Sequence, residues 1–138
     1  MKNGHIEIKT VLAVNNSEFI QLYKEAGWWH SDYDRDISFI PEIVKGSTVF
    51  AAAFDGSCMI GMGRAVSDNC SDAYIQDVVV LKEYRNRGIG GRIILHLIDE
   101  LKGRGIDWIG LIGEPGTESF YSKLGFGVLR GYIPMKLK

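Results

Sequence analysis

The feature that most constrains the fold is a turn rich in glycine and arginine, residues 85–91, between two segments of different periodicity. Residues 74–80 are rich in β-branched side chains, which favours a strand. After the turn, apolar residues recur at the spacing of one helical face: Ile93, Ile94, Leu97, Ile98 and Leu101. Residues 106–112 predict another strand. Strand, helix and strand in this order predict two parallel strands joined by a right-handed crossover.

The remaining segments predict an antiparallel sheet with helices. Residues 6–14 favour a first strand, and residues 17–26 follow the helical apolar spacing up to Gly27. A second helix is expected at about residues 36–45, after an aromatic-rich loop, residues 28–34. Two strand-like runs, residues 48–54 and 59–66, are joined across Asp55-Gly56 as a hairpin. We expect a short helix over residues 117–124 and a final strand pair at residues 126–130 and 133–137.

Composition excludes several classes of protein. The chain has 138 residues, a length typical of one domain, and a net charge of −1, which disfavours a nucleic-acid partner. No apolar run approaches the roughly 20 residues that cross a bilayer, so we expect no membrane association and a cytoplasmic location. Cys58 and Cys70 lack the spacing of a zinc site, so no metal is expected.

The turn has the features of a pyrophosphate site. Its glycines expose the backbone N–H groups of a helix N-terminus, and two arginines flank them. A P-loop is excluded because Gly91 is followed by Arg92-Ile93, without the required lysine. A dinucleotide fingerprint is excluded because it needs a small residue where Ile93 stands. From the glycines alone, a plain connection between strand and helix is an equally good interpretation.

Two motifs resemble those of the GCN5-related N-acetyltransferase (GNAT) family. The family pattern Gln/Arg-x-x-Gly-x-Gly/Ala is matched by Arg85-Asn86-Arg87-Gly88-Ile89-Gly90. A later Phe-Tyr-x-Lys-x-Gly-Phe pattern is matched by residues 120–126. The resemblance is clear over residues 48–126 and holds in outline before that. It implies a single α/β (α+β) domain over residues 1–138, with a mixed, mostly antiparallel sheet of about six to seven strands. One parallel pair would be splayed, and about four helices would flank the sheet.

The resemblance also implies a cosubstrate, acetyl-CoA, and an activity, transfer of its acetyl group to a primary amine by direct attack on the thioester. Pantetheine would insert along the splayed strand and the pyrophosphate would lie on the turn. The implied cofactor-binding residues are Val78, Val79, Val80, Arg85, Asn86, Arg87, Gly88, Ile89, Gly90 and Gly91.

Two residues are candidates for proton transfer. Tyr121 matches the position from which family members protonate the departing thiolate; a core tyrosine is the alternative. Asp77 would accept the amine proton, directly or through water, and a carboxylate that only bonds nearby backbone is an equal alternative.

The acceptor is expected to be a small-molecule amine. Trp28, Trp29 and Tyr33 are candidates for one wall of its pocket, although a tryptophan that caps the core is the favoured interpretation of each indole taken singly. A peptide or protein amine is the alternative acceptor, and a non-catalytic acetyl-CoA sensor is the alternative function. The resemblance also leaves a homodimer possible.

Overall fold

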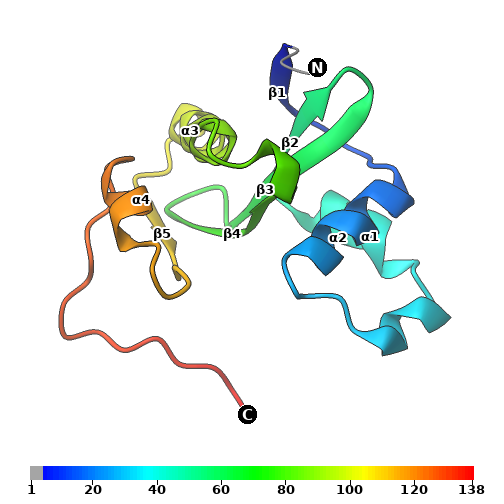
Figure 1. Ribbon diagram of the computed structural model, residues 1–138. Coiled ribbons are helices and arrows are strands. Elements are labelled where there is room, and N and C mark those ends of the chain that lie inside the picture. The colour runs from blue at the N-terminus through cyan, green and yellow to red at the C-terminus, as the bar shows by residue number, and fades with distance from the viewer. Residues whose placement is uncertain (1–4) are drawn as a thin grey trace.

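The computed structural model describes residues 5–138, and its elements follow the order expected from the sequence (Figure 1). Residues 1–4, which the predicted domain includes, lie outside the described part. The elements are β1 (Ile6–Thr10), α1 (Asn16–Glu25), a 3₁₀ helix (Ser31–Arg35), α2 (Phe39–Gly46), β2 (Val49–Asp55), β3 (Cys58–Ser67), β4 (Asp72–Val80), a 3₁₀ turn (Lys82–Tyr84), α3 (Ile89–Gly103), β5 (Trp108–Leu111) and α4 (Glu118–Ser122).

The five strands form one mixed sheet in the order β1-β2-β3-β4-β5. The pairings from β1 to β4 are antiparallel: short hairpin connections reverse the chain between β2 and β3 and between β3 and β4, whereas α1 and α2 lie in the connection from β1 to β2. The pairing of β4 with β5 is parallel, because α3 carries the chain back across the sheet between them. The predicted mixed α/β class, with a parallel pair at one end and four α-helices, is therefore confirmed.

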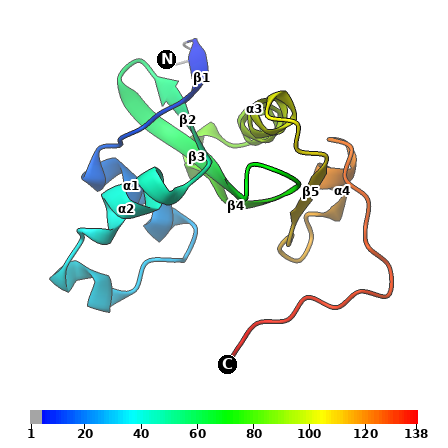
Figure 2. The same ribbon diagram turned by 180° about the vertical axis from the view of Figure 1, so that it is seen from behind.

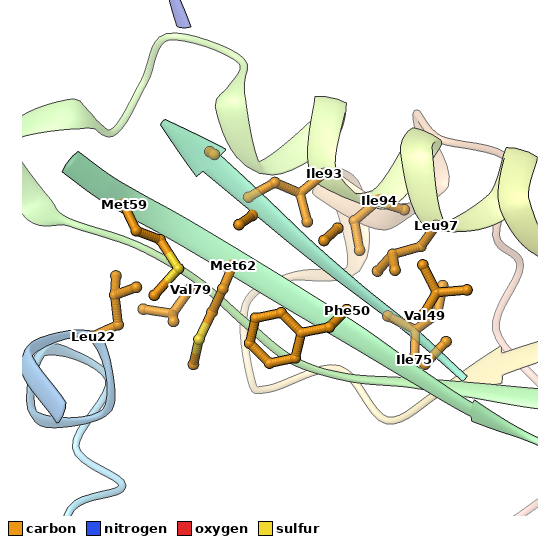
Figure 3. Packing of buried hydrophobic residues seen from close by; sticks show 14 of the residues in the cluster. Leu22, Val49, Phe50, Met59, Met62, Ile75, Val79, Ile93, Ile94 and Leu97 are labelled. Atoms are coloured by element: carbon orange, nitrogen blue, oxygen red, sulfur yellow. The ribbon is translucent and has the colours of Figure 1, made fainter. Parts of the chain in front are cut away.

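Helices cover both faces of the sheet. Helix α3 lies on one face, and α1 and α2 lie together on the other, as opposite views show (Figures 1 and 2). The apolar stripe of α3 packs over β2 and β3, and Leu22 of α1 lies beside Met59 and Val79 (Figure 3). Gly63 allows α3 to lie close to β3, because a Cβ atom there would be 2.8 Å from Ile93 Cγ2. The core thus extends on both sides of β3.

The predicted pair of C-terminal strands is wrong. Residues 127–138 run away from the body of the molecule without a strand (Figures 1 and 2), and Ile133, Met135 and Leu137 are exposed. Alternating apolar residues favour a strand, but a strand also needs a neighbour that accepts its backbone hydrogen bonds. In this described segment the backbone hydrogen bond present is a local one, from Tyr132 N to Leu129 O. The sheet consequently has five strands rather than six to seven.

Two N-terminal boundaries also differ from the expectation. The aromatic segment predicted as a loop contains the 3₁₀ helix Ser31–Arg35. Helix α2 begins at Phe39 rather than near residue 36, because the Asp36 carboxylate accepts the N–H of Ser38 in a turn before the helix. Pro41 then lies in the first turn of α2, where a missing N–H costs nothing.

Candidate functional site

The two parallel strands separate before β4 ends. Pairing of β4 with β5 runs from Asp72–Trp108 to Ile75–Leu111, while β4 continues to Val80. Beyond Ile75, the edge of β4 that faces β5 has no strand partner among the described residues. Its backbone N–H and C=O groups are therefore free to bond an extended ligand in the manner of an added strand.

A β-bulge lies at the point of separation. Met62 of β3 pairs with Val79, whereas Arg64 pairs with Gln76, so that Asp77 and Val78 together oppose Gly63. Asp77 has φ +59°, in the left-handed region. Its carboxylate oxygen Oδ2 accepts hydrogen bonds from the Tyr23 hydroxyl at 2.6 Å and from Arg64 Nε at 2.8 Å. Asp77 is thus held from α1 and from β3 beside the open edge of β4.

The turn after β4 presents a helix N-terminus. Gly88 is the N-cap of α3, with φ +79°, and Asn86 also has a positive φ, +64°. The first helical hydrogen bond of α3 runs from Arg92 N to Gly88 O, so the N–H groups of residues 89–91 have no intrahelical acceptor and are available to a ligand. No side chain occupies the cap position, and the space next to Gly88 is open. The geometry suits a phosphate group, as the sequence motif predicts.

The two arginines of the turn each donate a hydrogen bond to a backbone carbonyl. Arg85 donates from Nε to the Val80 carbonyl at 3.0 Å and forms an ion pair with Glu25 of α1 at 3.5 Å. Arg87 donates to the Glu83 carbonyl at 3.0 Å and lies over the Tyr84 ring. Arg85 thus ties the end of β4 to α1, and Arg87 remains exposed on the turn.

Helix α4 brings Tyr121 to the end of β5. The Tyr121 ring packs edge-to-face against Phe120 and Phe126, and it lies 3.6 Å from the position a Cβ of Gly113 would take. Its hydroxyl has no hydrogen-bond partner among residues 5–138. Burial, and secondarily the charge of Glu114, raise the pKa of Tyr121, so the phenol keeps its proton. A half-buried phenol of this kind can donate a proton.

Phe120 links α4 to the turn. A Cβ atom at Gly90 would be 3.4 Å from Phe120 Cζ and 4.0 Å from Val80 Cγ2. The first turn of α3, the end of β4 and α4 therefore meet at one place. Val79 and Ile89 are buried, so their side chains serve the core and a ligand would contact their backbone.

The aromatic candidates near the N-terminus divide into two groups. Trp28 packs edge-to-face on Tyr23, with ring centroids 5.3 Å apart. Tyr23 in turn bonds Asp77, so Tyr23 connects Trp28 to that carboxylate. Trp29 and Tyr33 pack on each other and on Phe39 instead, and the Trp29 indole donates to Asp34. These contacts place Trp28 beside the site, while Trp29 and Tyr33 form a separate aromatic cluster.

Three residues near the site were missed by the sequence reasoning: Tyr23, Glu25 and Arg64. The sequence does indicate a role for Arg64, because a charged residue within the otherwise apolar strand β3 needs a partner of opposite charge. Tyr23 follows the helical apolar spacing of residues 17–26, which predicts a place in the core. Its hydroxyl contact with Asp77 depends on residues 54 positions apart, which no local pattern reveals.

The fold and these motifs are those of the GNAT class, and comparison with known proteins agrees. Residues 9–126 match the profile described as "Acetyltransferase (GNAT) family". The chain belongs to this family. Within residues 5–138, no helix combines the length and the apolar character that crossing a membrane requires.

Particular relatives are similar over most of the chain. The uncharacterized N-acetyltransferase ycf52 of Pyropia yezoensis is 33% identical over 117 residues, which are 82% of this chain and 65% of that protein. A GNAT family acetyltransferase of Streptococcus pneumoniae TIGR4 superposes with a TM-score of 0.79 at 26% identity, covering 97% and 96% of the two chains. AAC(6')-Iy, solved with the bisubstrate analog CoA-S-monomethyl-acetylneamine, has a TM-score of 0.77 at 16% identity, covering 98% and 99%, and so shows a shared fold.

Proposed function

We propose that this protein transfers an acetyl group from acetyl-CoA to a primary amine of a small molecule. The observation that carries the proposal is the separation of β4 from β5 beside the free N-terminus of α3. An extended amide-containing arm and a pyrophosphate, joined in one ligand, match these two neighbouring features. Membership of the GNAT family supports acetyl-CoA as that ligand.

The cosubstrate would be held mainly by backbone groups. Residues 78–80 would bond pantetheine along the open edge of β4, and the N–H groups of residues 87–91 would bond the pyrophosphate. Arg87 would add charge at the turn, whereas Arg85 would keep β4 in place through its bond to Val80. Asn86 would contribute through the positive φ that shapes the turn.

The chemistry would proceed by direct attack of the neutral amine on the thioester carbonyl. As the C–S bond breaks, Tyr121 would give its proton to the coenzyme A thiolate, a role suited to a phenol that stays protonated. Asp77 would take the proton that the amine loses, through Oδ1 or through water, since Tyr23 and Arg64 both donate to Oδ2. Free backbone N–H groups of β4 are the candidates for stabilising the oxyanion.

The acceptor would lie on the side of Trp28 and Tyr23. Trp28 is the aromatic candidate that reaches Asp77 through a chain of contacts, which supports its place in the pocket wall. Trp29 and Tyr33 would then support the outer part of the pocket as a packed cluster. An aromatic wall with a nearby carboxylate favours a small cationic amine.

A homodimer is supported by two features at the C-terminal side of the molecule. The outer edge of β5 has no strand partner among the described strands, and residues 128–137 carry exposed apolar side chains next in sequence to α4. Such surfaces are usually covered by another chain. The cytoplasmic location stays a prediction.

The test is thiol release from acetyl-CoA with a panel of arylalkylamines, polyamines, amino sugars, aminoglycosides and peptides, and with Tyr121→Phe in parallel. Turnover with a small amine, lost in the variant, is the expected result. Turnover with peptides alone would move the acceptor to protein amines. Acetyl-CoA binding without turnover on any amine would favour the sensor function.

A further inference from the structure

The bulge in β4 is an unusual conformation for the residue that occupies it. Asp77 is not a glycine, yet its φ is +59°, which ordinary side chains adopt rarely because of steric conflict with the backbone. The bulge begins two residues after Ile75, the last residue of β4 that pairs with β5. The conformation of Asp77 therefore affects how β4 leaves β5.

Two elements, α1 and β3, bond the carboxylate of this residue. Tyr23 of α1 donates to Oδ2 at 2.6 Å, and Arg64 of β3 donates to the same oxygen at 2.8 Å. The Arg64 and Asp77 side chains are 17% and 20% exposed, and Tyr23 is 8% exposed, so water competes little with these bonds. Arg64 is itself held by Gln76 Oε1 at 3.3 Å and by Ser47 Oγ at 3.5 Å.

Asp77 accepts more hydrogen bonds than neutralisation of its charge requires. One ion pair would satisfy the charge, but here two donors from different layers bond one oxygen, and none of the described hydrogen bonds uses the other oxygen. Two bonds at Oδ2 fix both the direction of the carboxylate and the backbone that carries it.

We propose that Tyr23 and Arg64 are positioning residues for acetyl transfer, which act by holding Asp77 and the β4 bulge in a single orientation beside the open strand edge. The proposal rests on the proposed function, because it concerns the same site. Neither residue touches the reacting atoms in it. Their effect is on the geometry of Asp77 Oδ1 and of the backbone next to it.

The experiment compares Tyr23→Phe with Tyr84→Phe. Both variants keep the aromatic ring, and both lose a 2.6 Å hydrogen bond from a phenol to an aspartate Oδ2. The Tyr84 bond goes to Asp55 on β2, which is separated from β4 by β3 in the sheet. We expect Tyr23→Phe to lower kcat about tenfold, the effect of one hydrogen bond worth about 1.4 kcal/mol, and to leave the Kd for acetyl-CoA within about twofold. Tyr84→Phe should leave kcat unchanged.

Arg64→Gln and Arg64→Lys give a second comparison. Gln removes the charge and the fork of donors, so kcat should fall at least as far as in Tyr23→Phe, while Lys keeps a donor and should restore part of the rate. Urea unfolding of all four variants separates the loss of rate from loss of folded protein.

Equal effects of Tyr23→Phe and Tyr84→Phe on kcat, or wild-type kcat in both Tyr23→Phe and Arg64→Gln, would overturn the proposal and leave the proposed function standing. A wild-type protein without turnover on any acceptor would overturn both.

Discussion

Tyr121 combines the properties that a proton donor needs. It is half-buried, its hydroxyl is free of hydrogen bonds from described residues, and its pKa is raised by burial. These properties depend on the phenol oxygen, whereas the packing of the ring on Phe120 and Phe126 does not. Removal of the oxygen therefore separates the two roles.

Tyr121→Phe should lower kcat by about 10²-fold, because a general acid contributes about that much or more, and it should leave the Kd for acetyl-CoA nearly unchanged. Steady-state kinetics and calorimetric titration measure the two quantities. Tyr132→Phe is the matched control, since Tyr132 is 77% exposed and lies in the C-terminal segment. A wild-type rate in Tyr121→Phe would remove the phenol from the mechanism.

Gly63 lies where the packing of α3 on the sheet leaves no room for a side chain. An added Cβ would lie 2.8 Å from Ile93, 3.2 Å from Val78 and 3.3 Å from Leu97, all in the contact of β3 and β4 with α3. Gly63→Ala should lower the free energy of unfolding by about 1–3 kcal/mol, the usual cost of overpacking. Gly46→Ala, with nothing within 4 Å and no positive φ, should leave it unchanged or slightly higher. Urea unfolding measures both, and equal midpoints would contradict this packing argument.

At the scale of elements, the turn between β4 and α3 carries the proposed pyrophosphate site. Arg87→Glu with Gly88→Asp should weaken acetyl-CoA binding about tenfold or more, because negative charge and bulk are placed at the helix N-terminus. Aspartate tolerates the positive φ of Gly88 better than most residues, and Arg87→Glu alone is a milder variant with the same expected direction.

Arg104→Glu is the control for Arg87→Glu, because it makes the same charge change at the opposite end of α3. Titration calorimetry with acetyl-CoA measures the three affinities. Retained affinity in the double variant would place the pyrophosphate elsewhere.

At the scale of the whole molecule, the outer edge of β5 has no partner among the described strands, and the C-terminal segment adds exposed apolar side chains. Ile133 and Leu137 are 77% and 94% exposed, so their replacement by charged residues costs the monomer little. We expect the wild type to be dimeric by size-exclusion chromatography with light scattering, and Ile133→Glu with Leu137→Glu to shift it to monomer. Leu12 is 87% exposed and lies in the connection between β1 and α1, so Leu12→Glu should leave the dimer intact. A monomeric wild type would contradict the homodimer.

Folded-state stability should decline in alkaline solution. The pKa values of Tyr23, Tyr84 and Tyr121 are all raised above the ordinary value of 10.0: burial is the main cause for Tyr23 and Tyr121, and the hydrogen bond to Asp55 is the main cause for Tyr84. The unfolded chain releases these protons near pH 10, while the folded chain retains them. The free energy of unfolding is thus at its full value below pH 10 and falls as the pH rises above it.

Urea midpoints between pH 8 and pH 11.5 measure this decline, and Tyr23→Phe should make it shallower. A midpoint that stays constant across this range would contradict it.

Much of the molecule was determined by the sequence alone, because local physics carries it. Periodicity located α1 and α3, β-branched residues located β4, and the glycine turn required a helix N-terminus after a strand. Strand, helix and strand then dictated the parallel pairing of β4 and β5, since a right-handed crossover is the accessible connection. The turn, Tyr121 and the family followed from short motifs for the same reason.

Only the tertiary structure decided which distant groups meet. The bonds of Tyr23 and Arg64 to Asp77, and of Arg85 to Glu25, join residues that no spacing relates, because hydrogen bonds across layers depend on how α1 packs on the sheet. In the C-terminal segment, tertiary structure decided that a predicted element is absent. Its alternating apolar residues have strand character, but a strand exists only when a neighbouring backbone accepts its hydrogen bonds, and the described fold places none beside it.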